Sequence, residues 1–120
     1  MKQALLALLL PLTAFAADAE NGRRIALGRM DGNCLLCHAI PGADRPAGNF
    51  GPSLAGIGSK LSARQIRERI VDASRFNPKT VMPPYGRTDG LHQVASQYRG
   101  KPVLSAAEID DLVAFLLTLR

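Results

Sequence analysis

Two cysteines and a histidine fall within one short stretch of this chain, Cys34-Leu35-Leu36-Cys37-His38. The spacing Cys-x-x-Cys-His is the attachment signature of a c-type haem. Each thiol can add across one vinyl group of the porphyrin, and the spacing suits one helical turn, so both sulfurs reach the same edge of the ring. The imidazole that follows lies under the iron as the proximal ligand. The motif therefore predicts one haem c, bound covalently by Cys34 and Cys37, with His38 on its iron.

Other uses of the same cysteines fit the sequence less well. A Cys-x-x-Cys redox disulfide belongs in a βαβ setting, and the sequence shows no such pattern. A zinc site would need Cys34, Cys37, His38 and His92 together. Neighbouring residues such as Cys37 and His38 rarely point at one tetrahedral metal, which disfavours zinc.

The second axial position of a haem iron decides between electron transfer and ligand chemistry. Met82 lies in the stretch Val-Met-Pro-Pro-Tyr at residues 81–85. Prolines fix their own φ and hold the preceding residue extended, so this loop is stiff and can present a thioether at little entropic cost. Met82 is therefore the predicted second ligand. His92 is the alternative, and Met30 is expected to be core or surface.

The N-terminus has the anatomy of a secretory signal peptide. Lys2 precedes an apolar run from Ala4 to Ala16 that is interrupted by Pro11 and ends in small residues. A membrane anchor is disfavoured because the run is short for a bilayer span. We expect a signal peptide over residues 1–16, with cleavage after Ala16 or Ala19, and a cytochrome domain over residues 17–120. Haem of this type is attached outside the cytoplasm, so the mature chain is expected in the periplasm, with no membrane contact after cleavage.

Composition bounds the remaining possibilities. The mature chain has the size of one small domain and only 5% aromatic residues, with no tryptophan. A chain this short buries a limited core, so the haem itself is expected to complete it. The formal net charge is +5. Nucleic acid is disfavoured because the basic residues are scattered and form no recognisable binding motif, which leaves an acidic protein, a small anion or a plain solvated surface.

Helical signals recur along the chain. A first helix is predicted over residues 20–29, leading into the haem motif. Ser62 with Gln65, and Ser105 with Glu108, have the spacing of capping boxes that begin two further helices. The last helix carries a broad apolar stripe, made up of Ile109, Leu112, Val113, Leu116 and Leu117. Residues 40–59 are rich in Gly and Pro and predict a loop around one side of the haem. With no strand pattern, the fold class is all-α.

With these motifs placed, the chain resembles the class I c-type cytochromes over nearly all of its mature length. That resemblance implies short helices and Gly/Pro loops around a covalently bound haem. The stretch Gly51-Pro52-Ser53-Leu54 is similar to the family's Gly-Pro-x-Leu segment. The resemblance implies that the Pro52 carbonyl accepts a hydrogen bond from the proximal histidine, which would place Pro52 in the shell around His38 that orients its ring.

Several stretches resemble one branch, the monohaem SoxX subunits of the SoxAX cytochromes of bacterial sulfur oxidation. They are GNCLLCH at 32–38, GNFGPSL at 48–54, VMPPY at 81–85 and GKPVL at 100–104. The resemblance implies a heterodimer with a larger SoxA-type cytochrome, a cysteine S-thiosulfotransferase that couples thiosulfate oxidatively to a cysteine of a SoxYZ-type carrier. This chain has no spare cysteine for catalysis. It is therefore expected to be the electron-accepting subunit, without catalytic residues, that passes electrons to a small cytochrome c.

Two functions stay open from the sequence. One is this bound subunit of a thiosulfate-conjugating enzyme, and the other is a free periplasmic electron carrier. A permanent partner predicts a sizeable apolar patch on the surface, whereas a carrier predicts a small docking area around the haem edge. Residues 86–103, with Leu91, Val94 and Tyr98, are the candidate for part of such a patch, or else a loop packed on its own domain.

Overall fold

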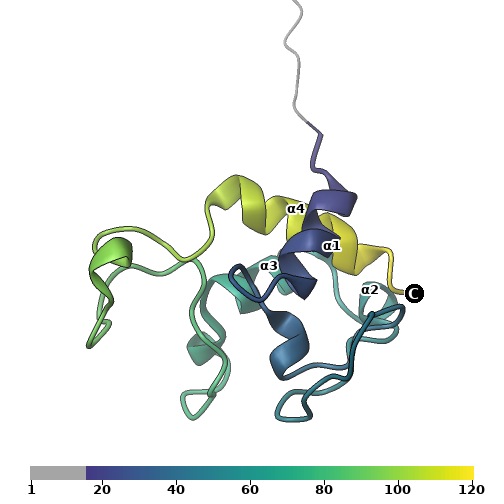
Figure 1. Cartoon of the computed structure of the whole chain (residues 1–120), viewed down its shortest axis with the longest axis horizontal. Helices are drawn as coiled ribbons and strands as arrows, with labels where there is room; N and C mark the ends of the chain where they lie inside the picture. Colours follow the sequence, from purple (N-terminus) through teal and green to yellow (C-terminus); the bar gives the residue numbers. More distant parts are fainter. Residues whose placement is uncertain (1–15) are drawn as a thin grey trace, which may run out of the picture.

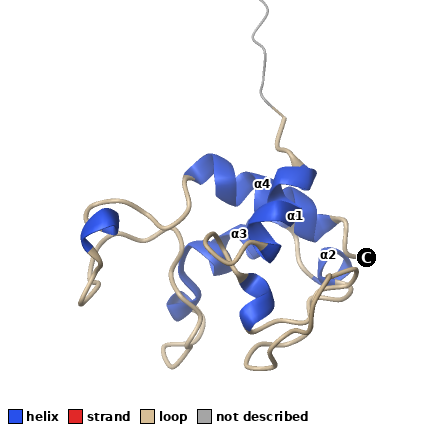
Figure 2. Cartoon of the chain, in the orientation of Figure 1, coloured by secondary structure: helices blue, strands red, loops and turns tan. Residues whose placement is uncertain are grey.

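The computed structural model describes residues 16–120, and this part of the chain consists of helices and loops without a strand (Figure 2). The α-helices are α1 (Ala19–Leu27), α2 (Ile57–Lys60), α3 (Ala63–Asp72) and α4 (Ala106–Leu117). Short 3-10 turns are η1 (Cys34–Leu36), η2 (Ala73–Arg75) and η3 (Ser96–Tyr98). The predicted all-α class is confirmed. The predicted signal segment lies almost wholly outside the described residues, and within them no helix has the length and apolar character to cross a bilayer.

Side chains fix where the helices begin, as the sequence predicts. Ser62 Oγ accepts a hydrogen bond from the Gln65 amide at 3.2 Å, and Gln65 Oε1 accepts one from the Ser62 amide at 2.9 Å. Ser105 and Glu108 form the same capping box at the start of α4, so both predicted boxes are confirmed. Helix α1 differs from its prediction at its end, which comes at Leu27. The extended backbone of Gly28 stops it, and the Gly28 amide bonds to the carbonyl of Arg24.

Helices α1 and α4 cross in close contact, as Figure 1 shows. The crossing depends on Gly22, because a Cβ there would lie 2.0 Å from the carbonyl oxygen of Asp111. Asp111 also reaches across the crossing, accepting from the Asp18 amide at 2.7 Å and from the Asn21 side chain at 2.8 Å. These two hydrogen bonds lower the pKa of Asp111. One carboxylate of α4 thereby satisfies donors at the start of α1.

The core lies where α1, α3 and α4 meet the haem motif. Leu35, between the two cysteines, is 2% exposed and belongs to this core. Helix α4 supplies Ile109, Leu112, Val113, Phe115 and Leu116, and the other members come from α1, α3 and the flanking loops: Ile25, Ala26, Ile40, Ile66, Ile70 and Leu104. The buried side chain of Leu35 therefore anchors the Cys-x-x-Cys turn in the core. Cys34 and Cys37 line the cavity beside the turn.

The segment of residues 86–103, here called the arm, projects away from the helices (Figure 1, green). Its base is fastened to α3. The Gly86 amide bonds to the Val71 carbonyl at 3.2 Å, and Arg87 pairs with Asp72 at 3.2 Å. Hydrogen bonds from the hydroxyl and amide of Ser74 and the charge of Arg87 lower the pKa of Asp72, so this pair is ionised at neutral pH. The arm thus leaves the domain from a fixed point.

Candidate haem site

A cavity of about 490 Å³ opens beside the Cys-x-x-Cys-His turn. Its walls bring together Cys34, Cys37 and His38 from the motif, Pro52 from the following loop, and Met82. Cofactor sites are typically concave, mostly apolar and about 300–1,000 Å³ in volume. The sequence-predicted site residues therefore converge on one hollow of the right size, although Met82 is separated from the motif by two helices in the chain.

The motif turn is shaped by its own backbone. Asn33 adopts a left-handed conformation, with φ of 46°, and turns the chain into η1. Asparagine tolerates this region better than most residues do. The amides of Cys37 and His38 then bond to the Cys34 carbonyl at 3.1 and 2.9 Å. This turn places both cysteine side chains and the imidazole along one side of the cavity.

The proximal wall is the loop over residues 48–54, which folds back on the motif. Its amides of Gly48, Gly51 and Leu54 bond to carbonyls of the motif turn and of Ala39, at 2.8–3.0 Å. The ring of His38 lies against the backbone of Gly51, where an added Cβ would lie 2.3 Å from Cε1. The Nδ1 atom of His38 is 2.6 Å from the Pro52 carbonyl oxygen. A carbonyl can only accept, so Nδ1 carries the proton and Nε2 is left with its lone pair.

The opposite wall is the loop that carries Met82. Its amide donates to Thr80 Oγ1 at 3.1 Å, and the Thr80 amide bonds to the Asn77 carbonyl at 3.0 Å. Tyr85 closes this wall, and its hydroxyl donates to the Gly32 carbonyl at 2.6 Å. Burial raises the pKa of Tyr85 to about 12, so the hydroxyl keeps its proton at neutral pH.

The alternative ligands lie elsewhere. Met30 is 89% exposed, His92 is exposed, and neither lines the cavity. Within residues 16–120, no three His, Cys, Asp or Glu side chains are grouped to hold a metal ion, which excludes the zinc arrangement there. Cys34 and Cys37 are free thiols. Burial raises the pKa of Cys34 to about 11, which disfavours the thiolate that redox exchange requires.

The residues present fit a haem. Imidazole and thioether donors face one apolar hollow, and Gly51 leaves the space that the imidazole occupies. A neutral imidazole with Nδ1 held by a carbonyl is the form that ligates a metal through its other nitrogen. Free cysteines with the attachment spacing lie on the same side of the hollow.

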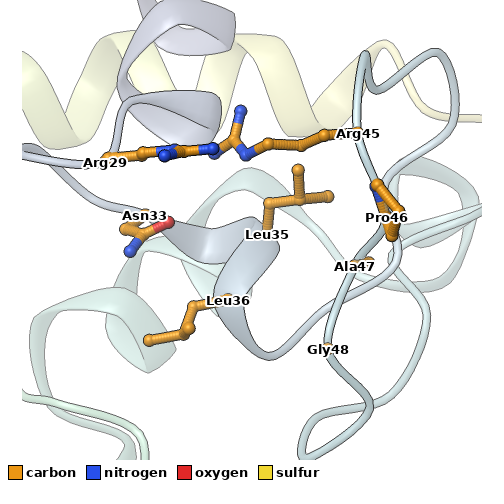
Figure 3. Close-up of a pocket in the computed structure, with 8 residues that line it drawn as sticks. All are labelled: Arg29, Asn33, Leu35, Leu36, Arg45, Pro46, Ala47 and Gly48. Carbon is orange, nitrogen blue, oxygen red and sulfur yellow. The ribbon is translucent and has the colours of Figure 1, made fainter.

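A second hollow, of about 540 Å³, lies against the same motif turn (Figure 3). The side chains of Arg29 and Arg45 extend over it toward one another, above Leu35. Arg45 also donates to the Leu27 carbonyl and pairs with Asp44 at 3.2 Å. Asn33 and Leu36 line both hollows, so positive charge lies close to the haem cavity.

Comparison with known proteins decides the family. Residues 19–120 match the family model described as cytochrome c. The chain belongs to the cytochrome c family. It binds one covalent haem c with its iron, as the motif predicted.

This cytochrome is similar to a solved structure described as SoxXA from P. pantotrophus. The match has a TM-score of 0.77 and 33% identity, and covers 92% of this chain and 87% of that one. The SoxX-type resemblance seen in the sequence motifs is thereby confirmed. An uncharacterized lipoprotein of Aquifex aeolicus is 33% identical over 90 residues, which are 74% of this chain but 37% of that protein. The cytochrome thus matches little more than a third of the length of this relative.

Several site residues were not predicted from the sequence. The bond from Tyr85 to Gly32 joins residues 53 positions apart, and no local pattern indicates it. The approach of the Arg29 and Arg45 side chains over the second hollow also depends on how two loops meet. The Val-Met-Pro-Pro-Tyr stretch was the available signal for Tyr85, because it placed an aromatic residue beside the methionine.

Gly51→Ala tests how closely the proximal loop packs on His38. The added Cβ overlaps the imidazole, so we expect a loss of about 1–3 kcal/mol in the free energy of unfolding of the holoprotein and a changed ferric absorbance spectrum. Gly90→Ala separates overlap from backbone strain, because its Cβ meets nothing within 4 Å and its cost comes from φ of 65° alone, so its spectrum should stay that of the wild type. A Gly51→Ala protein with the wild-type spectrum and the wild-type stability would contradict this packing.

Proposed function

We propose that this cytochrome is the monohaem, electron-accepting subunit of a periplasmic SoxAX-type complex. The observation that carries the proposal is the likeness to the SoxXA structure over 92% of this chain, together with a cavity that brings His38 and Met82 to one hollow. The apolar N-terminal run and the thioether chemistry of the motif support export to the periplasm, with residues 1–16 removed.

The haem is held by residues of both walls in this proposal. Cys34 and Cys37 would form the thioethers, and His38 Nε2 and the Met82 thioether would bind the iron. The Pro52 carbonyl, 2.6 Å from Nδ1, orients the imidazole and makes it more basic. When bound, the haem supplies a one-electron couple between ferric and ferrous iron. Thioether ligation raises the reduction potential, which suits an acceptor.

The role as acceptor follows from what the chain lacks. Both cysteines of the sequence would serve the haem, and iron ligation by both His38 and Met82 would leave no position for substrate. Coupling of thiosulfate to a carrier cysteine forms a sulfur–sulfur bond and releases one proton and two electrons. One haem would supply a one-electron acceptor, so two such transfers, each followed by transfer to the next carrier, would be needed for each bond formed. The chemistry of bond formation is then the task of the larger SoxA-type subunit.

The surface offers two docking regions for such partners. Three apolar side chains, Leu36, Phe50 and Val81, line the haem cavity, so the cofactor would cover part of each and the remainder would surround its edge. An apolar face around the haem suits a permanent partner. The arm can extend this contact with the exposed parts of its apolar side chains, since each of these is half-buried: Leu91, Val94 and Tyr98. Arg29 and Arg45 beside this face suit the transient, salt-sensitive docking of acidic proteins, here a small cytochrome c or a SoxYZ-type carrier.

Co-purification separates this proposal from the free carrier. The chain is tagged at its C-terminus and expressed in the native host on thiosulfate, and we expect a larger cytochrome in stoichiometric amount. Phe50→Asp with the wild-type haem content should reduce its recovery, because it puts a charge among the apolar side chains around the haem cavity. Met30→Asp is the control, as Met30 is equally exposed but outside the cavity. A monomer with an intact haem spectrum would instead support a diffusible electron carrier.

Met82→Ala tests the axial assignment. Loss of the thioether should abolish the absorbance band of sulfur-to-iron(III) ligation and lower the reduction potential, because a weaker or different ligand then meets the iron. Met30→Ala and His92→Ala should leave both unchanged. If the band survives in Met82→Ala, Met82 is not a ligand.

A further inference from the structure

The two walls of the haem cavity are fastened to the motif turn in different ways. Two backbone hydrogen bonds, from Gly48 and Gly51, and the bond between His38 Nδ1 and the Pro52 carbonyl hold the proximal loop to this turn. Among the described residues, the loop over residues 76–85 makes a single hydrogen bond to residues 28–38, the one from the Tyr85 hydroxyl to the Gly32 carbonyl. The methionine wall is therefore the one that can open most easily.

Tyr85 lies at the end of the Met82 loop, where both its backbone and its hydroxyl bond to other parts of the domain. Its amide donates to the Ile70 carbonyl at 3.2 Å, and its carbonyl accepts from the Leu104 amide at 3.1 Å. These bonds fix the backbone of Tyr85 to α3 and to the segment that leads into α4. The side chain crosses the cavity wall from this fixed point to the residue two positions before Cys34. It joins the end of the methionine loop to the covalent attachment point.

We propose that Tyr85 is a positioning residue that latches the Met82 loop closed over the iron and thereby sets how often the thioether leaves it. This inference rests on the proposed ligation by Met82. It goes beyond that ligation because it assigns a role to Tyr85, which is not one of the two proposed iron ligands. The hydrogen bond from the Tyr85 hydroxyl to the Gly32 carbonyl holds the Met82 loop to the segment before Cys34, and the strength of this bond governs how often the loop opens.

Tyr85→Phe removes this hydrogen bond while keeping the aromatic ring in the cavity wall. The test measures the rate at which imidazole binds the ferric holoprotein, because an external ligand enters only after Met82 has left. We expect this rate to rise about two- to tenfold, which is what one net hydrogen bond is worth. The haem content and the far-ultraviolet circular dichroism should stay as in the wild type.

Tyr98→Phe is the matched control, since Tyr98 lies in the arm and outside the cavity, and its rate should equal that of the wild type. Met82→Ala gives the rate for an open site. A Tyr85→Phe rate equal to the wild-type rate, with Met82→Ala much faster, would overturn the latch and leave the ligation standing. A wild-type rate as fast as that of Met82→Ala would instead overturn the ligation by Met82, and the latch with it.

Discussion

The turn from Cys34 to His38 is the point to which every other part of the site is tied. Leu35 anchors it in the core from behind, and the loop of residues 48–54 is bonded to its carbonyls. The methionine wall reaches Gly32, two residues before the turn, through the Tyr85 hydroxyl. A chain with so few aromatic residues cannot fill a large core. The structure instead folds two loops around the motif turn, and the cavity between them is the space that we propose for the cofactor.

Local signals in the sequence predicted the parts that local chemistry determines. The capping boxes at Ser62 and Ser105 each involve residues three positions apart, and both were found. The end of α1 was missed by two residues, because Gly28 stops the helix where the apolar pattern gives no sign. The crossing at Gly22 and the reach of Asp111 to Asp18 depend on two helices at opposite ends of the chain. Such contacts exist only after folding.

The two walls of the cavity differ in how strongly they are held to the motif turn. The ring of His38 is held by the backbone of Gly51 and by the carbonyl of Pro52, and these contacts favour one tautomer and one orientation. The methionine wall depends on side-chain bonds of Thr80 and Tyr85. The hollow beneath Arg29 and Arg45 shares Asn33 and Leu36 with the haem cavity, so in the proposed complex positive charge would lie beside the haem.

The most direct test of the account follows the haem during the reaction. The purified complex is mixed anaerobically with thiosulfate and the carrier protein, and the absorbance of this subunit's ferrous haem is recorded by stopped flow while carrier conjugate is quantified by mass spectrometry. The account predicts that the haem is reduced as conjugate forms, and only when carrier and partner subunit are both present. Conjugate that forms at full rate while this haem stays ferric would contradict its role as electron acceptor.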